Sequence, residues 1–488
     1  MENIITIKDV ALVSPLLAVF IASLFPIGAK VIRGNREQAP FITLFQALLG
    51  IGVAVALSMT YGADVSVSAF VGALKFDGAA KSMTIVVSLI AAFSLFISYG
   101  NINTKGSQFS EHVFLLLNTL VGMYVMIWAN DLIIVFIGLE IMSLALYMLI
   151  ALSREQKLAK EAAFKYFILG SLASAIFLYG VAFLYGSVGS TFFDQITQIA
   201  PSAIGSDSVF IMGALLALVG MLFKVSIFPF HSWTPDVYQG APTSLTAFMS
   251  TGVKIASFAV ILRLVSTGVI ADGGGIFEIL QWLAVLTMLV GNIAAIVQDN
   301  FKRILAYSSV AHSGYILVGV IVTGLGVDAN IGYSSTLFYL FTYAVVNVGL
   351  LTLVSSMESK EESTITVQDL RGLGQKKPVL SLVITVLLLS LAGIPPLAGF
   401  FGKFYLFAGA IDMGLYWLAL WGVVNSVISV YYYLRPIVMM YMKEEEAGQE
   451  AVKPDLLSYL NIGITFGLVI VLGIFSGDLF QYFLDMGL

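Results

Sequence analysis

The chain has 488 residues, of which 59% are hydrophobic and 11% are charged, and this charged fraction is about half that of a soluble domain. The composition is that of a membrane protein and excludes a soluble enzyme. The absence of cysteine excludes disulfides, thiol nucleophiles and thiolate-held iron–sulfur clusters, and three histidines leave little for a metal or haem site. A net charge of −5 shows no basic excess, so nucleic acid is not an expected partner.

Apolar runs of about 20 residues, each long enough to cross a bilayer, follow one another along the chain. Loops that hold most of the charge separate them. The first run lacks a small-residue cleavage site and is followed by basic residues, so we interpret it as a retained helix rather than a signal peptide. Fourteen runs are predicted, at residues 10–29, 41–60, 82–100, 112–129, 131–152, 162–187, 209–228, 243–269, 276–297, 303–325, 331–356, 379–411, 414–441 and 457–483.

Lysine and arginine are distributed unevenly over the loops on the two sides. One set of alternating loops carries three of them, Lys8, Lys75 and Lys81. Because cytoplasmic loops retain positive charge during insertion, we expect the richer side to be cytoplasmic and both chain ends to lie on the outer side. The richer set carries sixteen, namely Lys30, Arg33, Arg36, Lys105, Arg154, Lys157, Lys160, Lys302, Arg303, Lys360, Arg371, Lys376, Lys377, Arg435, Lys443 and Lys453.

The five remaining basic residues fall inside predicted membrane helices, as does the carboxylate of Glu140. An ionisable group within a membrane is costly unless it faces a partner or water, so each such group indicates a functional site. Arg263 lies near a helix end, where its side chain can instead reach the interface. Lys165 lies one turn inside its run, so it can be either a functional residue or a side chain that reaches the interface. The groups that cannot easily reach the interface are Glu140, Lys224, Lys254 and Lys403.

Proline interrupts two of the runs. The first interruption is FKVSIFPFHSWTPDVYQGAPT, which contains Lys224, and the second is LAGIPPLAGFFGKF, which contains Lys403. A proline frees a carbonyl that lipid cannot satisfy, so such breaks are expected where they are buried in protein or line a wet cavity. The part of the first string after Pro229 can also be a simple loop between two helices.

The broken runs are the seventh and the twelfth, five crossings apart. A tandem copy with an odd number of crossings must insert upside down, which predicts an inverted repeat of the kind found in secondary transporters. We therefore expect an all-α polytopic membrane protein with two inverted five-helix repeats. The expected boundaries are an N-terminal three-helix segment at 1–110, repeats at 111–270 and 271–441, and a last helix at 442–488.

Buried charges of both signs can form a proton switch. Burial favours the neutral form of a lysine and a nearby carboxylate favours the charged form, so joining or separating the pair moves a proton. Glu140 can pair with Lys224 or with Lys165. Histidine suits a relay position, although His312 can equally be a satisfied core histidine, and His231 can brace its loop or take up protons. The other polar groups in this part of the chain are Ser308, Ser309, Tyr343, Asn347 and Asn425.

No phosphate-binding loop, haem pair or Rossmann fingerprint is found in the sequence. The energy for transport is therefore expected from an ion gradient or from a partner. The longest polar segment, residues 357–378, has the length of a linker and can brace against a neighbour.

Four long strings carry a resemblance: FKVSIFPFHSWTPDVYQGAPT, AYSSVAHSGY, DLRGLGQKKP and GIPPLAGFFGKF. They are similar to the antiporter-like subunits of proton-pumping NADH-quinone oxidoreductase, respiratory complex I, a family that includes the Mrp-type sodium/proton antiporters. Within it the chain resembles the subunit N group, because it is expected to end after its fourteenth helix with no lateral helix appended. Some sister subunits have glutamate where this chain has Lys403.

The resemblance implies a membrane-arm subunit that translocates protons in the bacterial plasma membrane. By this resemblance, the residues of proton translocation are Glu140, Lys224, Lys254 and Lys403. Lys165 and His312 are candidate relay residues. NADH, FMN, iron–sulfur clusters and quinone are expected in partner subunits, which include the peripheral redox arm, and no cofactor is expected in this chain. The alternatives are a cation/proton antiporter subunit of the Mrp type and a structural subunit that does not pump.

Overall fold

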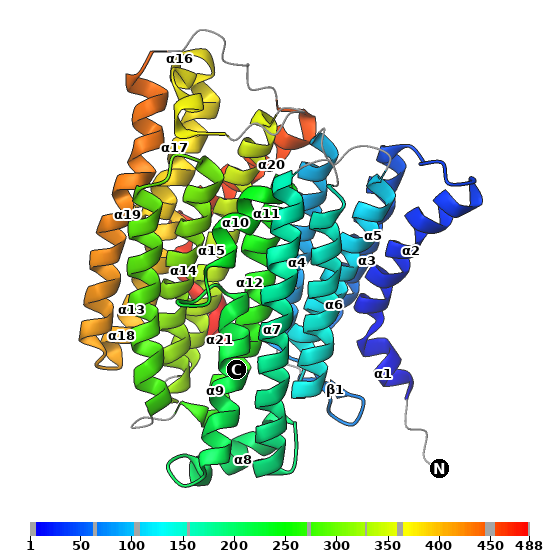
Figure 1. Ribbon diagram of the computed structural model, residues 1–488, viewed down its shortest axis with the longest axis vertical. Coiled ribbons are helices and arrows are strands. Elements are labelled where there is room, and N and C mark those ends of the chain that lie inside the picture. The colour runs from blue at the N-terminus through cyan, green and yellow to red at the C-terminus, as the bar shows by residue number, and fades with distance from the viewer. Residues whose placement is uncertain are drawn as a thin grey trace.

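The computed structural model describes residues 6–61, 66–101, 108–153, 157–270, 275–326, 329–358, 365–444 and 454–486. Within these ranges, twelve spans are long and apolar enough to cross a membrane, and they run roughly parallel to one another (Figure 1). They are α2 (Ser14–Ile32), α3 (Pro40–Met59), α4 (Gly78–Gly100), α5 (Phe109–Trp128), α6 (Leu132–Ala151), α7 (Lys157–Val188), the composite span α11–η1–α12–η2 (Thr243–Val269), α13 (Gly275–Ile296), α14 (Phe301–Gly324), α15 (Ala329–Met357), α19 (Tyr416–Met442) and α20 (Leu456–Ile474).

The two remaining predicted runs are the ones that proline interrupts. The seventh forms α9 (Ser208–Lys224), which ends five residues before Pro229. The twelfth is divided into α17 (Pro378–Ala392) and α18 (Ala398–Asp412), and Pro395 and Pro396 lie between them. The chain is therefore an all-helical polytopic membrane protein, as the sequence predicted, and the breaks lie where the prolines lie.

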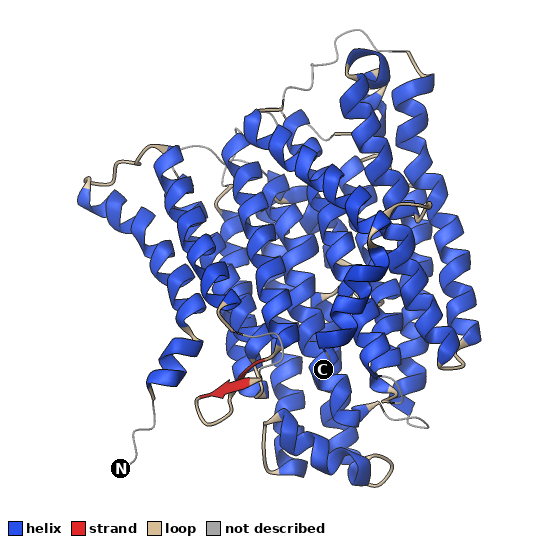
Figure 2. Ribbon diagram, turned by 180° about the vertical axis from the view of Figure 1, so that it is seen from behind, coloured by secondary structure: helices blue, strands red, loops and turns tan. Residues whose placement is uncertain are grey.

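Several short elements were not predicted. A two-stranded hairpin, β1 (Val67–Ala69) with β2 (Leu74–Phe76), lies at the same end of the molecule as α1 (Ile7–Leu12) and α8 (Phe193–Ala203) (Figures 1 and 2). At the other end, α10 (Trp233–Gly240) follows the first break, and η3 (Val367–Leu370) and α16 (Leu373–Lys376) precede α17. The last helix, α21 (Ser476–Met486), follows α20. These elements are too short for hydropathy to detect.

Aspartates begin several of the spans. The side chains of Asp77, Asp131, Asp207 and Asp455 accept hydrogen bonds from the first free backbone amides of α4, α6, α9 and α20. Such capping satisfies donors that have no partner within the helix. The charged residues at these loop ends thus serve to begin helices.

The central helices are the most enclosed. An 18-residue stretch of the composite span Thr243–Val269 is completely buried, and the corresponding stretches of α14 and α15 are nearly so, whereas fewer than half of the residues in those of α2 and α3 are buried. A helix that is enclosed on all sides can place polar side chains away from lipid. Polar side chains on α12 (Lys254–Leu264), α14 and α15 are thus shielded from lipid.

Candidate functional site

Lys224 is the last residue of α9, where the first break begins, and its side chain is 1% exposed. Its Nζ donates to Ser143 Oγ at 2.8 Å and lies 3.4 Å from Tyr147 OH, both on α6. The ring of Tyr166 is also close, with its centre 5.2 Å from Nζ. Lys224 is held by hydroxyls and aromatic faces, which stabilise a cation without fixing it in an ion pair.

Glu140, which the sequence predicted to be buried, is only half-buried. It lies on α6 between Ile137 and Leu144, which are 45% and 44% exposed, so it shares the outward face of that helix. Among the described residues it forms no ion pair, although it interacts electrostatically with Lys224. The expectation of a buried Glu140 was wrong because the apolar run of α6 has no distinct polar face, so periodicity could not orient the helix.

Lys165 lies at the rim of the bundle, and its side chain is 38% exposed. Its Nζ is 2.6 Å from Glu161 one turn earlier and 2.6 Å from Asp236 on α10. Asp236 also accepts a hydrogen bond from Arg303 on α14 at 2.8 Å. In this structure Lys165 therefore pairs with these carboxylates and not with Glu140, because α10 folds back against α7 after the break.

Asp236 joins three elements through one carboxylate, so its removal has a testable consequence. Partial burial raises the pKa of Asp236, but the hydrogen bonds from Lys165 and Arg303 outweigh this and hold the pKa below its ordinary value of 3.8. Asp236→Ala is expected to destabilise the protein by about 1 kcal/mol, after allowance for solvent screening of a partly exposed group. Thermal unfolding in detergent measures this loss.

The matched control is Glu161→Ala, which removes only the exposed partner of Lys165 and is expected to cost at most about 0.5 kcal/mol. A depressed pKa stabilises the folded state above the ordinary value and ceases to do so as pH falls through the lowered value. The effect of Asp236→Ala should therefore shrink at acid pH. Equal effects of the two variants would contradict the network.

Lys254 begins α12 directly after a π-helical turn, η1 (Met249–Val253), and is 1% exposed. Its Nζ donates to the backbone carbonyl of Ser309 and to Ser313 Oγ at 2.7 Å, both on α14. The ring of Tyr343 on α15 lies 5.3 Å away. Single π-turns often occur at functional sites, and this one was not apparent from the sequence.

His312 lies between two tyrosine hydroxyls. Its Nδ1 is 2.5 Å from Tyr339 OH on α15, and its Nε2 is 2.9 Å from Tyr433 OH on α19. Tyr433 OH in turn bonds to Ser308 Oγ. Both ring nitrogens of His312 have hydrogen-bond partners, and the side chain is 2% exposed. This geometry fits a buried histidine with satisfied hydrogen bonds, and it also gives a proton relay one partner on each side.

Lys403 lies on α18 just after the second break and is 4% exposed. Its Nζ donates to the carbonyl of Ala392 at 3.1 Å and to Ser426 Oγ at 2.9 Å. Ala392 ends α17, and Gly393 follows with a φ of 86°, a conformation that favours glycine. Lys403 thus satisfies a carbonyl at the end of an interrupted helix, as Pro-broken membrane helices require.

A polar cluster from α13 and α19 connects the histidine region with Lys403. Asn292 on α13 donates to Tyr315 OH at 3.2 Å and to Asn425 Oδ1 at 3.2 Å, and its own carbonyl oxygen accepts from Tyr432 OH at 2.9 Å. The centre of the Tyr315 ring lies 5.0 Å from Lys403 Nζ. Asn425 was expected from the sequence but Asn292, Tyr315 and Tyr432 were not, although a polar group in an apolar helix is the signal that identifies all four.

Arg263, near the end of α12, forms an ion pair with a residue that caps another helix. Its guanidinium donates to Asp77 at 2.9 Å, and both side chains are largely buried. His112 contacts Ser98 at 2.9 Å. Within the described ranges no group of three His, Cys, Asp or Glu side chains could hold a metal ion. Of the loop residues counted for orientation, Lys105, Arg154, Lys360 and Lys453 lie outside the described residues.

Comparison with known proteins agrees with this architecture. Residues 129–429 match the family "NADH:quinone oxidoreductase/Mrp antiporter, TM". A relative from Bdellovibrio bacteriovorus, NADH-quinone oxidoreductase subunit N, is 51% identical over 98% of both chains. A chain of respiratory complex I from Thermus thermophilus is 31% identical, with a TM-score of 0.82 over 96% of this chain and 98% of that one. A chain of the Mrp complex from Dietzia sp., 22% identical, has the same fold, with a TM-score of 0.82 over 97% and 96%.

The helical bundle, its two breaks and the family match define an antiporter-like membrane protein. More particularly, the chain belongs to the subunit N family of NADH-quinone oxidoreductase and is a multi-pass subunit of the complex I membrane arm. The resemblance read from the four sequence strings is thereby confirmed.

Proposed function

We propose that this chain translocates protons through its buried lysines while other subunits oxidise NADH and reduce quinone. The observation that carries the proposal is that Lys224, Lys254 and Lys403 are all enclosed, yet none forms an ion pair within the described residues. A lysine buried without a carboxylate is poised to exchange its proton, whereas a permanent ion pair would hold it. Hydroxyl partners can pass that proton on.

The two runs that proline interrupts also support proton translocation by this chain. Each interrupted run carries one of the lysines, and the two runs are five crossings apart. Transporters with inverted repeats place their ion sites on such discontinuous helices near the membrane centre. Under this proposal the repeats occupy 111–270 and 271–441. Lys224 exchanges its proton under the influence of Glu140, and Lys254, His312 and Lys403 conduct it further.

The family also supports a proposal for the partners of the chain and its location. NADH, FMN, iron–sulfur clusters and quinone are bound by partner subunits, and the peripheral arm supplies the energy. The chain lies in the bacterial plasma membrane with both ends on the outer side, as the charge distribution over its loops favours.

Reconstitution of the whole complex into liposomes tests the proposal. Lys254→Met is expected to lower the number of protons moved per NADH by about twofold or more, because it removes the ammonium. The loss is not complete, because a water can partly replace that group. The control Lys160→Met removes an exposed lysine and should change nothing. Undiminished pumping by an assembled Lys254→Met complex would overturn the proposal. Sodium/proton exchange by vesicles that contain this chain alone would instead favour an antiporter.

A further inference from the structure

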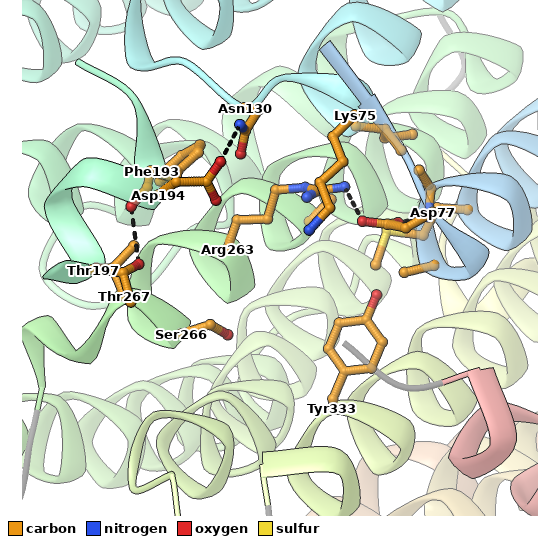
Figure 3. Close-up of a pocket in the computed structure, with 15 residues that line it drawn as sticks. Lys75, Asp77, Asn130, Phe193, Asp194, Thr197, Arg263, Ser266, Thr267 and Tyr333 are labelled. Atoms are coloured by element: carbon orange, nitrogen blue, oxygen red, sulfur yellow. Dashed lines mark hydrogen bonds and ion pairs between the residues drawn. The ribbon is translucent and has the colours of Figure 1, made fainter. Parts of the chain in front are cut away.

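A polar cavity of about 230 Å³ lies at the end of the molecule that carries α8 and the β1–β2 hairpin. Figure 3 shows the side chains of Asp77, Arg263 and Tyr333 around it, with Asn130 and Asp194 opposite. A water takes about 30 Å³, so the cavity has room for several. The charge distribution over the loops places this end on the outer side of the membrane.

The cavity and the central lysine share two helices. Arg263 and Lys254 are both on α12, nine residues or about 13.5 Å apart along its axis. Tyr333, which lines the cavity, and Tyr343, which faces Lys254, are both on α15. Ala259, also a lining residue, is five residues from Lys254. The inner end of the cavity is therefore about two turns or less from the lysine.

Two buried hydroxyls at this level have no partner within the described residues. They belong to Ser257 on α12, one turn from Lys254, and to Ser334 on α15, next to Tyr333. An orphaned buried hydroxyl is costly, and water ordinarily satisfies it. Along the axes of α12 and α15, these two hydroxyls lie between the level of the cavity and the level of Lys254.

The end of α12 at the cavity is also irregular. A second π-helical turn, η2 (Val265–Val269), begins two residues after Arg263 and contributes Ser266 and Thr267 to the lining. Thus α12 has a π-turn beside Lys254 and another beside Arg263. Such turns free backbone groups from the regular ladder and let a helix segment shift.

We propose that this cavity is an outer outlet for protons that reach Lys254, branching there from the path through His312 to Lys403, with the ion pair between Arg263 and Asp77 as its electrostatic gate. The proton leaves Lys254 Nζ for water beside Ser257, passes into the cavity and reaches the outer solution, and Lys254 is left neutral. A bare guanidinium on this route would repel the proton, as fixed arginines do in water channels. The carboxylate of Asp77 cancels that charge, and the other two charged residues of the lining, Lys75 and Asp194, are of opposite sign. The proposal rests on the proposed proton transport.

Water access can be measured separately from pumping, because the chain has no cysteine. Single cysteines are introduced as Thr267→Cys in the cavity, Ser257→Cys deeper on the route and Ala256→Cys as the control beside it. Silver ion, which binds thiolates and enters only through water, is added from the outer side to the reconstituted complex. Protection of each cysteine from later alkylation is read by mass spectrometry of this chain.

Thr267→Cys and Ser257→Cys are expected to react at least about tenfold faster than Ala256→Cys. If Ser257→Cys reacts no faster than the control, no water connects the cavity with the region of Lys254, and the proposal is wrong. A failure of the proposed function, shown by unaltered pumping of Lys254→Met, would leave this labelling result unchanged. The two failures are therefore distinguishable.

A single and a double variant that change the charge of the ion pair test the gate. Asp77→Asn leaves Arg263 uncompensated and should slow NADH-driven proton release about tenfold or more. Adding Arg263→Gln restores neutrality and should restore most of the rate. A purely structural ion pair predicts the opposite order, with the double variant at least as impaired as the single one, and that result would overturn the gate. Native gels verify that both variants assemble.

Discussion

Lys224→Met is expected to slow coupled NADH oxidation and the accompanying proton pumping about tenfold or more, because a positioned proton-transfer group commonly contributes about 10²- to 10⁴-fold to its step. The side chain is enclosed by Ser143, Tyr147 and Tyr166, and methionine fills a similar volume without a proton to exchange. Pumping into liposomes and NADH oxidation by the assembled complex are measured together. An assembled variant that pumps normally would refute the role.

Lys224→Arg separates proton exchange from mere positive charge. Arginine keeps the charge but does not give up its proton, so it should fail to pump even where it restores assembly. Glu140→Gln should impair pumping less than Lys224→Met, because Glu140 is half-buried and acts on Lys224 from a distance. If both act through one step, the double variant should be no worse than Lys224→Met alone. Strictly additive losses would show that the two residues act separately.

His312→Gln should lower the coupled rate about tenfold or more, by the same reasoning about proton-transfer groups. Glutamine can bond to the hydroxyls of Tyr339 and Tyr433, as the imidazole does, but it cannot accept and release a proton in turn. The variant therefore keeps the packing and removes the relay. The rate of NADH-driven pumping by the complex measures this.

The chain offers a matched control in His112→Gln. His112 is also enclosed and bonds to a hydroxyl, that of Ser98, but its partners are Ser98 and Phe109 and not a hydroxyl that contacts a buried lysine. Its replacement should leave pumping unchanged. If His312→Gln pumps like the control, His312 is a core histidine that satisfies two tyrosines, and the route from Lys254 to Lys403 must pass elsewhere.

The class of protein, the positions of the helical spans and the two broken helices could all be predicted from the sequence. Apolar runs of bilayer length and prolines act locally, so each leaves its mark within a few consecutive residues. Lysines inside an apolar run are equally conspicuous, and this is how Lys254, at the centre of its run, and Lys224 and Lys403, beside the breaks, were found. The β1–β2 hairpin and the π-turns on either side of α12 were missed, because nothing in their few residues distinguishes them.

The sequence by itself determined that three lysines lie within apolar runs of bilayer length, because only composition and position along the chain are needed for that. Only the tertiary structure decided what surrounds each one. It placed Glu140 on an outward face, tied Lys165 to Asp236 at the rim and set His312 between two tyrosines from other helices. A helix apolar on all sides has no polar stripe to orient it, so its rotation is decided by packing between helices that are distant in sequence.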